Sequence, residues 1–190
     1  MSDFSNGKGI HTYSVQEAVN QHLGKVIRVT PSVLAGATDD NDVMFAAPAE
    51  IPNAVSQKGG TSRLIAMTIV DYDAEAHDMD IFFSQKNEVA LGTQDGAVDI
   101  SDVNLSKQGV LGAITVNWGE SAVGLIGSSM VTVGPSSTVA GTNTSNQVPL
   151  PMLLQAQSDS TSVYFQGIAR EAADWAATGN LEFIFHIEYK

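Results

Sequence analysis

The stretch Arg63–Ser84 constrains the fold of this chain more than any other. It reads RLIAMTIVDYDAEAHDMDIFFS, with two apolar arms around an acidic middle. An exposed antiparallel strand alternates apolar with polar residues, whereas the first arm is apolar on both sides and therefore predicts a central strand or one covered by a partner. The two faces expected for it are Ile65, Met67 and Ile69 on one side, and Leu64, Ala66, Thr68 and Val70 on the other.

The second arm alternates more regularly and predicts a strand of its own. Met79, Ile81 and Phe83 share one face, and the intervening positions face the other way. The segment Tyr72–Asp78 between the arms is too long for a two-residue hairpin turn. We therefore expect a hairpin with a long acidic turn.

Short strands with Gly, Pro, Ser and Asp between them recur along the chain, which is typical of all-β proteins. Val33–Asp42 and Gly134–Gln147 read as loops, and Gly127 predicts a bulge or bend within a strand. Ser101 is a plausible N-cap for a short helix in Ile100–Lys107, ahead of Gly109. Further strands are expected at Lys25–Thr30, Val43–Ala46, Val89–Gly92, Val110–Val116, Leu125–Val133, Met152–Gln157, Ser162–Arg170 and Leu181–Tyr189.

These elements predict an all-β fold, an antiparallel β-sandwich or jelly roll, as a single domain over residues 25–190. Residues 1–24 read as an N-terminal arm with a short helix. Ser14 and Glu17 have the spacing of a capping box, and Gly24 can end that helix. The arm either packs on its own domain or reaches a neighbouring subunit.

Composition excludes several classes of function. The net charge is -12, from 21 acids and 9 bases, and it disfavours binding to nucleic acid or to anionic membranes. Only 16% of the residues are charged, as in β-sandwiches and in surfaces buried in assemblies, although an ordinary secreted β domain looks similar. There is no cysteine, no signal peptide, and no apolar run of the ~20 residues that cross a bilayer, so we expect a soluble product of a cytoplasm.

Two acidic clusters are candidate ion or catalytic sites. Asp39–Asp42 begins a run with Glu50 at the twelfth position, but Val43 and Met44 break the calcium-loop pattern. The carboxylates of Asp71–Asp80 invite comparison with a glycosidase pair or a divalent-ion site. Solvated turns are the favoured interpretation of both, and we assign no metal and no cofactor.

Other motifs are weaker. Gly119–Gly124 resembles a nucleophile elbow with its second glycine displaced, and His186 is the sole histidine after it. His11, His22 and His77 are scattered without metal-ligand spacing. Four aromatic residues raise the idea of a sugar-binding face, but packing is favoured for them: Trp118, Tyr164, Trp175 and Tyr189. No catalytic, cofactor-binding or metal-binding residue is assigned.

The order of strand sequences resembles small virion structural proteins of tailed bacteriophages, of the kind that decorate or cement the capsid. The resemblance spans Val26–Tyr189 and leaves out residues 1–24 and the loop Pro135–Gln147. It implies a β-sandwich, assembly on a virion and no enzyme activity. The segments that carry it are IRVTP from Ile27, DVMF from Asp42, AEIPNAV from Ala49, GGTSRLIAMTIVDYD from Gly59, DIFFS from Asp80, LGT from Leu91, AVDISD from Ala97, VYFQGIAR from Val163 and the closing strand.

The leading hypothesis is a phage head decoration or cement protein on the capsid surface. Its partners would be the major capsid protein and further copies of itself, most simply as a trimer, with residues 1–24 as the first candidate for the contact between subunits. The alternative is a phage tail, fibre or adaptor component that binds host glycan. A third hypothesis, a glycoside hydrolase or lyase, would use the acids of Asp71–Asp80.

Overall fold

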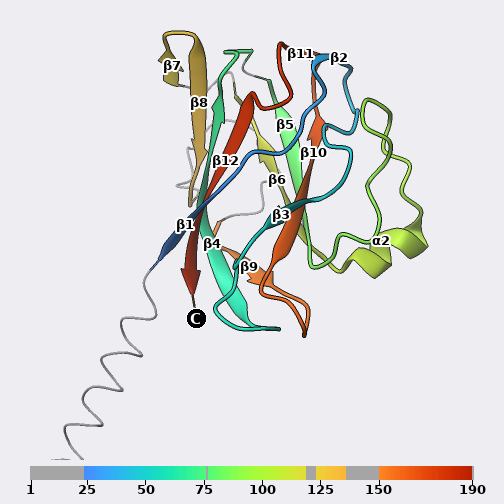
Figure 1. The fold of residues 1–190 in the computed structure, drawn as a ribbon, viewed down its shortest axis with the longest axis vertical. Coiled ribbons are helices and arrows are strands. Elements are labelled where there is room, and N and C mark those ends of the chain that lie inside the picture. Colours follow the sequence, from blue (N-terminus) through green and yellow to red (C-terminus); the bar gives the residue numbers. More distant parts are fainter. Residues whose placement is uncertain (1–23, 76, 119–122, 136–149, 190) are drawn as a thin grey trace, which may run out of the picture.

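The structure is a computed structural model, and it describes residues 24–75, 77–118, 123–135 and 150–189. The described part is all-β and antiparallel, with one short helix (Figure 1). This confirms the all-β class predicted from the sequence. The expected arm and helix of residues 1–24 lie outside the described residues, apart from Gly24. No helix in the described ranges is long and apolar enough to cross a membrane.

The largest sheet has six strands, and β4 lies at its centre. β12 pairs with one edge of β4, and β8 and β9 pair with successive parts of the other edge. The central position predicted for the apolar arm is therefore confirmed. β1 and β7 lie at the two ends of the strand order. The six strands are β1 Lys25–Val29, β4 Thr61–Asp71, β7 Val123–Leu125, β8 Ser128–Val133, β9 Met152–Gln155 and β12 Leu181–Tyr189.

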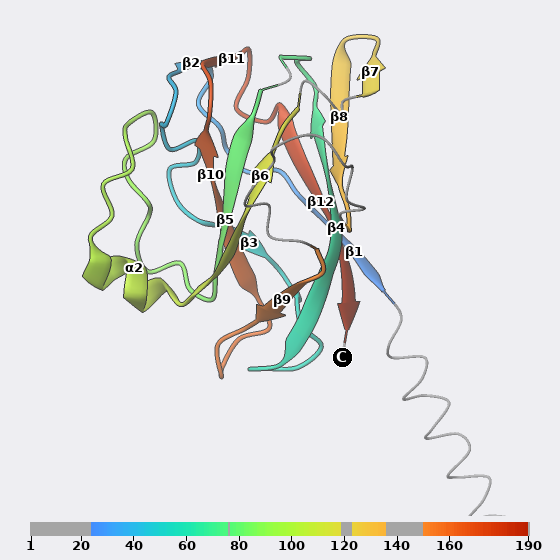
Figure 2. The same ribbon diagram turned by 180° about the vertical axis from the view of Figure 1, so that it is seen from behind.

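Two smaller sheets complete the fold. The four-stranded sheet has the order β3-β10-β5-β6, and β11 pairs with β2 in a two-stranded sheet. Figure 2 shows the four-stranded sheet beside the six-stranded one, with α2 and β7 at opposite sides of the molecule. The strands are β2 Gly36–Thr38, β3 Ala49–Ile51, β5 Met79–Ser84, β6 Val110–Val116, β10 Val163–Ala169 and β11 Ala173–Trp175.

The two larger sheets share one hydrophobic core built around phenylalanine rings. Phe165 of β10 lies 4.9 Å from Phe183 and 5.0 Å from Phe185 of β12, between ring centroids. Phe45 packs edge-to-face on both Phe165 and Phe183. All four rings are buried. Burying a side chain of this size stabilises a fold by roughly 1.5–3 kcal/mol, so this cluster is a major link between the sheets.

The hairpin expected for Arg63–Ser84 is wrong. β4 belongs to the six-stranded sheet and β5 to the four-stranded sheet, so the acidic segment between them crosses from one sheet to the other. Packed sheets lie about 10 Å apart, which a segment of this length spans easily. The alternation within β5 is as predicted, with Met79, Ile81 and Phe83 buried.

The faces expected for β4 need one correction. Leu64 is fully buried with Met67 and Ile69, although the alternation assigns it to the opposite face. The cause is a bulge in the pairing with β12: His186 pairs with Ala66 and Ile187 pairs with Leu64, which leaves Ile65 as the extra residue. A bulge of one residue reverses the alternation, so residues on both sides of it enter the core.

Two expected strands are buried loops. Val43–Ala46 and Val89–Gly92 form no strand, although Val43, Phe45 and Leu91 are buried. In place of a ladder, Val43 forms an isolated bridge with Ile168 of β10. The Gln166 side chain adds two bonds, since it donates to the Phe45 carbonyl and accepts from the Leu91 amide, each at 2.9 Å. The Met44 amide also donates to the Gly167 carbonyl at 2.9 Å, so backbone and glutamine bonds together hold the first of these loops on β10.

Other boundaries differ from expectation at the tight turns. Gly127, with φ 72°, lies in a two-residue turn between β7 and β8 and not in a bulge. β2 lies inside the predicted loop Val33–Asp42, and the sequence predicted neither β3 nor β11. These strands have three residues each, which is too short for an alternating pattern to be recognised in the sequence.

The helix α2, Asp102–Gln108, forms where its cap predicts. The Ser101 side chain accepts from the Asn104 amide at 3.4 Å. Gly109 ends the helix with φ 65°, and its amide donates to the Ser106 carbonyl. Of the helical residues, Gln108 alone is buried, and it accepts from the Glu88 amide at 3.2 Å. This helix therefore lies on the surface and is held at its ends.

Candidate functional site

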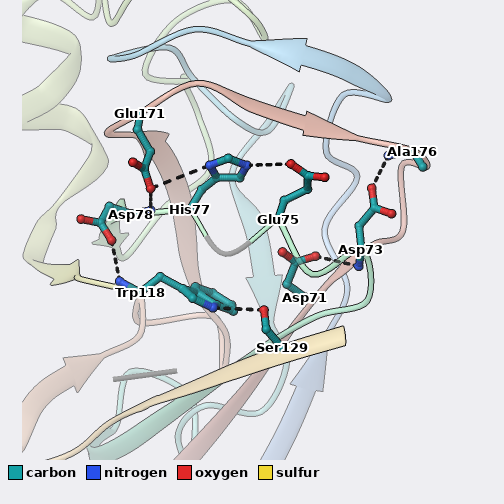
Figure 3. Close-up of polar contacts among 9 residues, drawn as sticks. All are labelled: Asp71, Asp73, Glu75, His77, Asp78, Trp118, Ser129, Glu171 and Ala176. Atoms are coloured by element: carbon teal, nitrogen blue, oxygen red, sulfur yellow. Dashed lines mark hydrogen bonds and ion pairs between the residues drawn. The ribbon is translucent and has the colours of Figure 1, made fainter. Parts of the chain in front are cut away.

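The acidic segment between β4 and β5 is the first candidate site, and the carboxylates of Asp71, Asp73 and Asp78 accept from backbone amides (Figure 3). Asp71 is buried and accepts from the Asp73 amide at 2.9 Å. Asp73 in turn accepts from the Ala176 amide at 2.6 Å. These bonds fasten the start of the crossover to itself and to the chain just after β11.

The end of the crossover is held in the same way. Asp78 accepts from the Trp118 amide at 2.5 Å, and its own amide donates to Glu171 at 2.8 Å. Asp80 accepts from the Thr115 hydroxyl at 2.6 Å and contacts Arg170 at 3.1 Å. The segment is thus more than the solvated turn expected from the sequence, because its carboxylates fasten three separate parts of the chain.

His77 lies inside this network. Its ring nitrogens are 3.4 Å from a Glu75 oxygen and 3.8 Å from a Glu171 oxygen. The ring packs edge-to-face on Trp175 with the centroids 5.9 Å apart. The histidine therefore joins the crossover to the segment around β11, a role that its isolated position in the sequence did not reveal.

These acids are not gathered as ion ligands. Among the described residues, no group of three or more His, Asp or Glu side chains is placed to hold a metal ion. Asp39 and Asp40 are exposed in a turn closed by the Asp42 amide on the Asp39 carbonyl, at 3.3 Å, with Asn41 at φ 69°. This agrees with the interpretation of Asp39–Asp42 as a turn.

The remaining predicted candidates divide into buried and undescribed residues. Trp118 and Trp175 are buried, and the Trp118 indole donates to Ser129 on β8 at 3.1 Å. Tyr164 and Tyr189 are half-buried on different sheets, so the four aromatics form no shared sugar platform. Residues 119–122 of the elbow-like motif, with His11 and His22, lie outside the described residues.

A surface that the sequence analysis missed is the more informative candidate. The register places side chains of β4, β7 and β8 on the side of the six-stranded sheet turned away from the core, and we call seven of them the outer face. All seven are half-buried or exposed. The outer face consists of Ala66, Thr68, Val70, Val123, Leu125, Met130 and Thr132.

The outer face is uncharged although the chain is strongly acidic. An exposed side of an antiparallel sheet is normally polar. Here Val123 pairs with Met130, and Met130 pairs with Val70, which makes an apolar row across three strands. Thr68 and Thr132 lie beside this row and share a hydrogen bond of 2.9 Å between their hydroxyls. The arrangement suits contact with another protein surface.

Charged residues lie beside the outer face on β12 and β1. Glu182 on β12 pairs directly with Val70 on β4. Its carboxylate accepts hydrogen bonds from Arg28 at 3.0 Å and from the Tyr72 hydroxyl at 2.8 Å. The hydrogen bond to Glu182, with desolvation and the nearby negative charge, raises the pKa of Tyr72 above its ordinary value. An apolar surface with a polar border of this kind is typical of protein interfaces.

A sequence signal for this surface exists. Residues 121–158 contain no Asp, Glu, Lys, Arg or His, although 16% of the chain is charged. β7, β8 and β9 all lie within that stretch. Periodicity assigns a residue to one face of its strand, but only the register between strands shows that these faces form one surface.

No protein-family model, no curated protein and no solved structure matches this chain.

Proposed function

We propose that the protein is a non-enzymatic decoration or cement protein of a tailed-phage capsid, bound at capsomer junctions through its outer face. The observation that carries the proposal is the uncharged outer face on a chain of net charge -12. An uncharged face can be buried against a partner without desolvating ionised groups, and burial of apolar area stabilises the contact by roughly 25 cal/mol per Å² before association costs. The strand sequences that resemble capsid-decorating proteins support the same function.

The arrangement of the acidic residues also supports a structural role. Asp73, Asp78 and Asp80 accept hydrogen bonds from the chain itself, which suits a rigid scaffold. A carboxylate that must accept or donate a proton in a reaction needs to face its substrate. The proposal therefore gives these acids a part in stability and none in a reaction.

We extend the proposal to the architecture, as a β-sandwich of the jelly-roll type. The contacts of Phe165 on β10 with Phe183 and Phe185 on β12 support it, since rings from both larger sheets meet in one core. The crossover from β4 to β5, which changes sheets, is also typical of sandwiches. Such a fold leaves one face of a sheet free to contact a partner.

Co-sedimentation with capsid shells tests the function. The shells are assembled from the major capsid protein of the same phage and pelleted with increasing amounts of this chain. We expect saturable pelleting that Thr132→Glu weakens about tenfold, which corresponds to about 1.4 kcal/mol. Val103→Glu, on the exposed surface of α2, adds the same charge away from the outer face and is the control.

Two results would contradict the proposal. The chain could stay in the supernatant at all concentrations, or the two variants could pellet equally well. Saturable binding on a glycan array, without binding to shells, would instead favour a tail or fibre component.

A further inference from the structure

Three exposed large apolar residues lie within four positions of one another in the hairpin of β7 and β8. Val123 is 57% exposed, Leu125 50%, and Ile126 at the turn is fully exposed. β7 is the last strand of its sheet, and among the described residues no strand pairs with its far edge. The hairpin thus combines an open backbone edge with apolar side chains.

Edge strands are normally protected against pairing by charge or proline. β1, at the other end of the same sheet, carries Lys25 and Arg28, and β3 of the four-stranded sheet carries Glu50. β6 is an uncharged edge as well, but Val110 alone among its large apolar residues is exposed. β7, with the sequence VGL, carries neither charge nor proline, and all three of its residues are exposed among the described part of the chain.

The backbone of Gly124 is directed toward that open edge. Leu125 and Ser128 flank the two-residue turn, and the next pair is Gly124 with Ser129. Hydrogen-bonded and non-hydrogen-bonded pairs alternate along an antiparallel ladder, and the pair that flanks a two-residue turn is a bonded one. The amide and carbonyl of Gly124 therefore point away from β8. Nothing described lies within 4 Å of the position that a Cβ would take there.

We infer that β7 pairs antiparallel with β7 of a second copy of this chain, around a two-fold axis at Gly124. Gly124 of each copy then exchanges hydrogen bonds with its counterpart, and Val123 lies opposite Leu125. The occupant is a second copy because the edge is self-complementary and uncharged. Two chains of net charge -12 repel each other elsewhere, whereas the stretch 121–158 carries no charge at all.

The inference goes beyond the proposed function, because this contact forms between purified chains without any shell. A two-fold contact gives a dimer of twice the 20.0 kDa chain mass. The trimer expected from the resemblance would need a head-to-tail contact instead. Because salt screens the repulsion between the two acidic chains, the dimer should become tighter as ionic strength rises.

Sedimentation equilibrium of the full chain over a concentration series tests the pairing. We expect a monomer–dimer equilibrium whose dissociation constant rises about tenfold or more in Val123→Lys. Val26→Lys is the matched control, because Val26 is 55% exposed on the edge strand β1 and the net charge changes equally. Circular dichroism and thermal unfolding check that both variants are folded.

A cross-linking experiment gives an independent readout. The chain has no cysteine, so Gly124→Cys introduces a single thiol. Directly paired residues have Cα atoms about 5.5 Å apart, within the range that a disulfide spans. Mild oxidation should give covalent dimers of Gly124→Cys and far fewer of Val26→Cys. A monomer at every concentration, a trimer, or equal cross-linking of the two variants would overturn the inference.

Discussion

At the scale of single residues, the protein uses its acids as internal acceptors. Asp78 is the clearest example of such an acceptor. Its carboxylate accepts from the Trp118 amide, and the Trp118 side chain is buried against Ser129. A backbone amide that loses its acceptor in a half-buried place costs stability. The acidic crossover is therefore held by specific bonds to the segments it passes.

Replacement of Asp78 tests this role. Asp78→Ala should lower the free energy of unfolding by about 1–3 kcal/mol, because the Trp118 amide loses its partner. Urea unfolding followed by tryptophan fluorescence measures the change. Asp40→Ala, at an exposed turn position, should stay within about 0.5 kcal/mol of the parent. Equal effects of the two substitutions would count against the role given to Asp78.

Tyr72 offers a second test at this scale. The Glu182 carboxylate accepts a hydrogen bond from the Tyr72 hydroxyl and raises the pKa of Tyr72. Glu182→Gln should therefore bring that pKa back toward 10.0. Because the folded-state value lies above the unfolded one, the stability linked to Tyr72 is present below pH 10 and is lost as the pH rises through the raised pKa. Titration of the ring carbon signals by NMR measures it. An unchanged pKa would show that Glu182 is not the cause.

At the scale of elements, local patterns predicted the long strands and the helix. Val110–Val116 and Leu181–Tyr189 are strands at the predicted residues, and Ser101 caps α2. Alternation and capping are properties of neighbouring residues, so the sequence alone shows them. The sheet change after β4 and the bulge at Ile65 depend on partner strands far away in sequence, and no local pattern reports them.

The packing of β10 on a buried loop provides the test at this scale. A Cβ on Gly167 would lie 2.8 Å from the Met44 sulfur and 3.1 Å from the Phe45 ring. Gly167→Ala should therefore destabilise the protein by about 1–3 kcal/mol through overpacking. Gly134→Ala is the matched control, with nothing within 4 Å among the described atoms. Thermal unfolding compares them, and equal midpoints would show that the Val43–Ala46 loop does not press on β10.

At the scale of the whole molecule, the charge distribution links the fold to the proposed function. Acidic residues are frequent, yet the outer face on β4, β7 and β8 is uncharged. The acidic clusters could be predicted from the sequence, but their bonding could not. The outer face was missed because it requires the register between β4 and the hairpin of β7 and β8, which lies far from β4 in the chain.

The proposed function requires that the chain stabilise a capsid shell. The most direct measurement is the temperature at which shells of the major capsid protein disassemble, followed by light scattering with and without saturating chain. A ligand that binds the assembled state alone must stabilise that state. We predict a higher disassembly temperature with the parent chain and with Val103→Glu, and a smaller rise with Thr132→Glu at equal concentration. An unchanged temperature at saturating occupancy would contradict the claim.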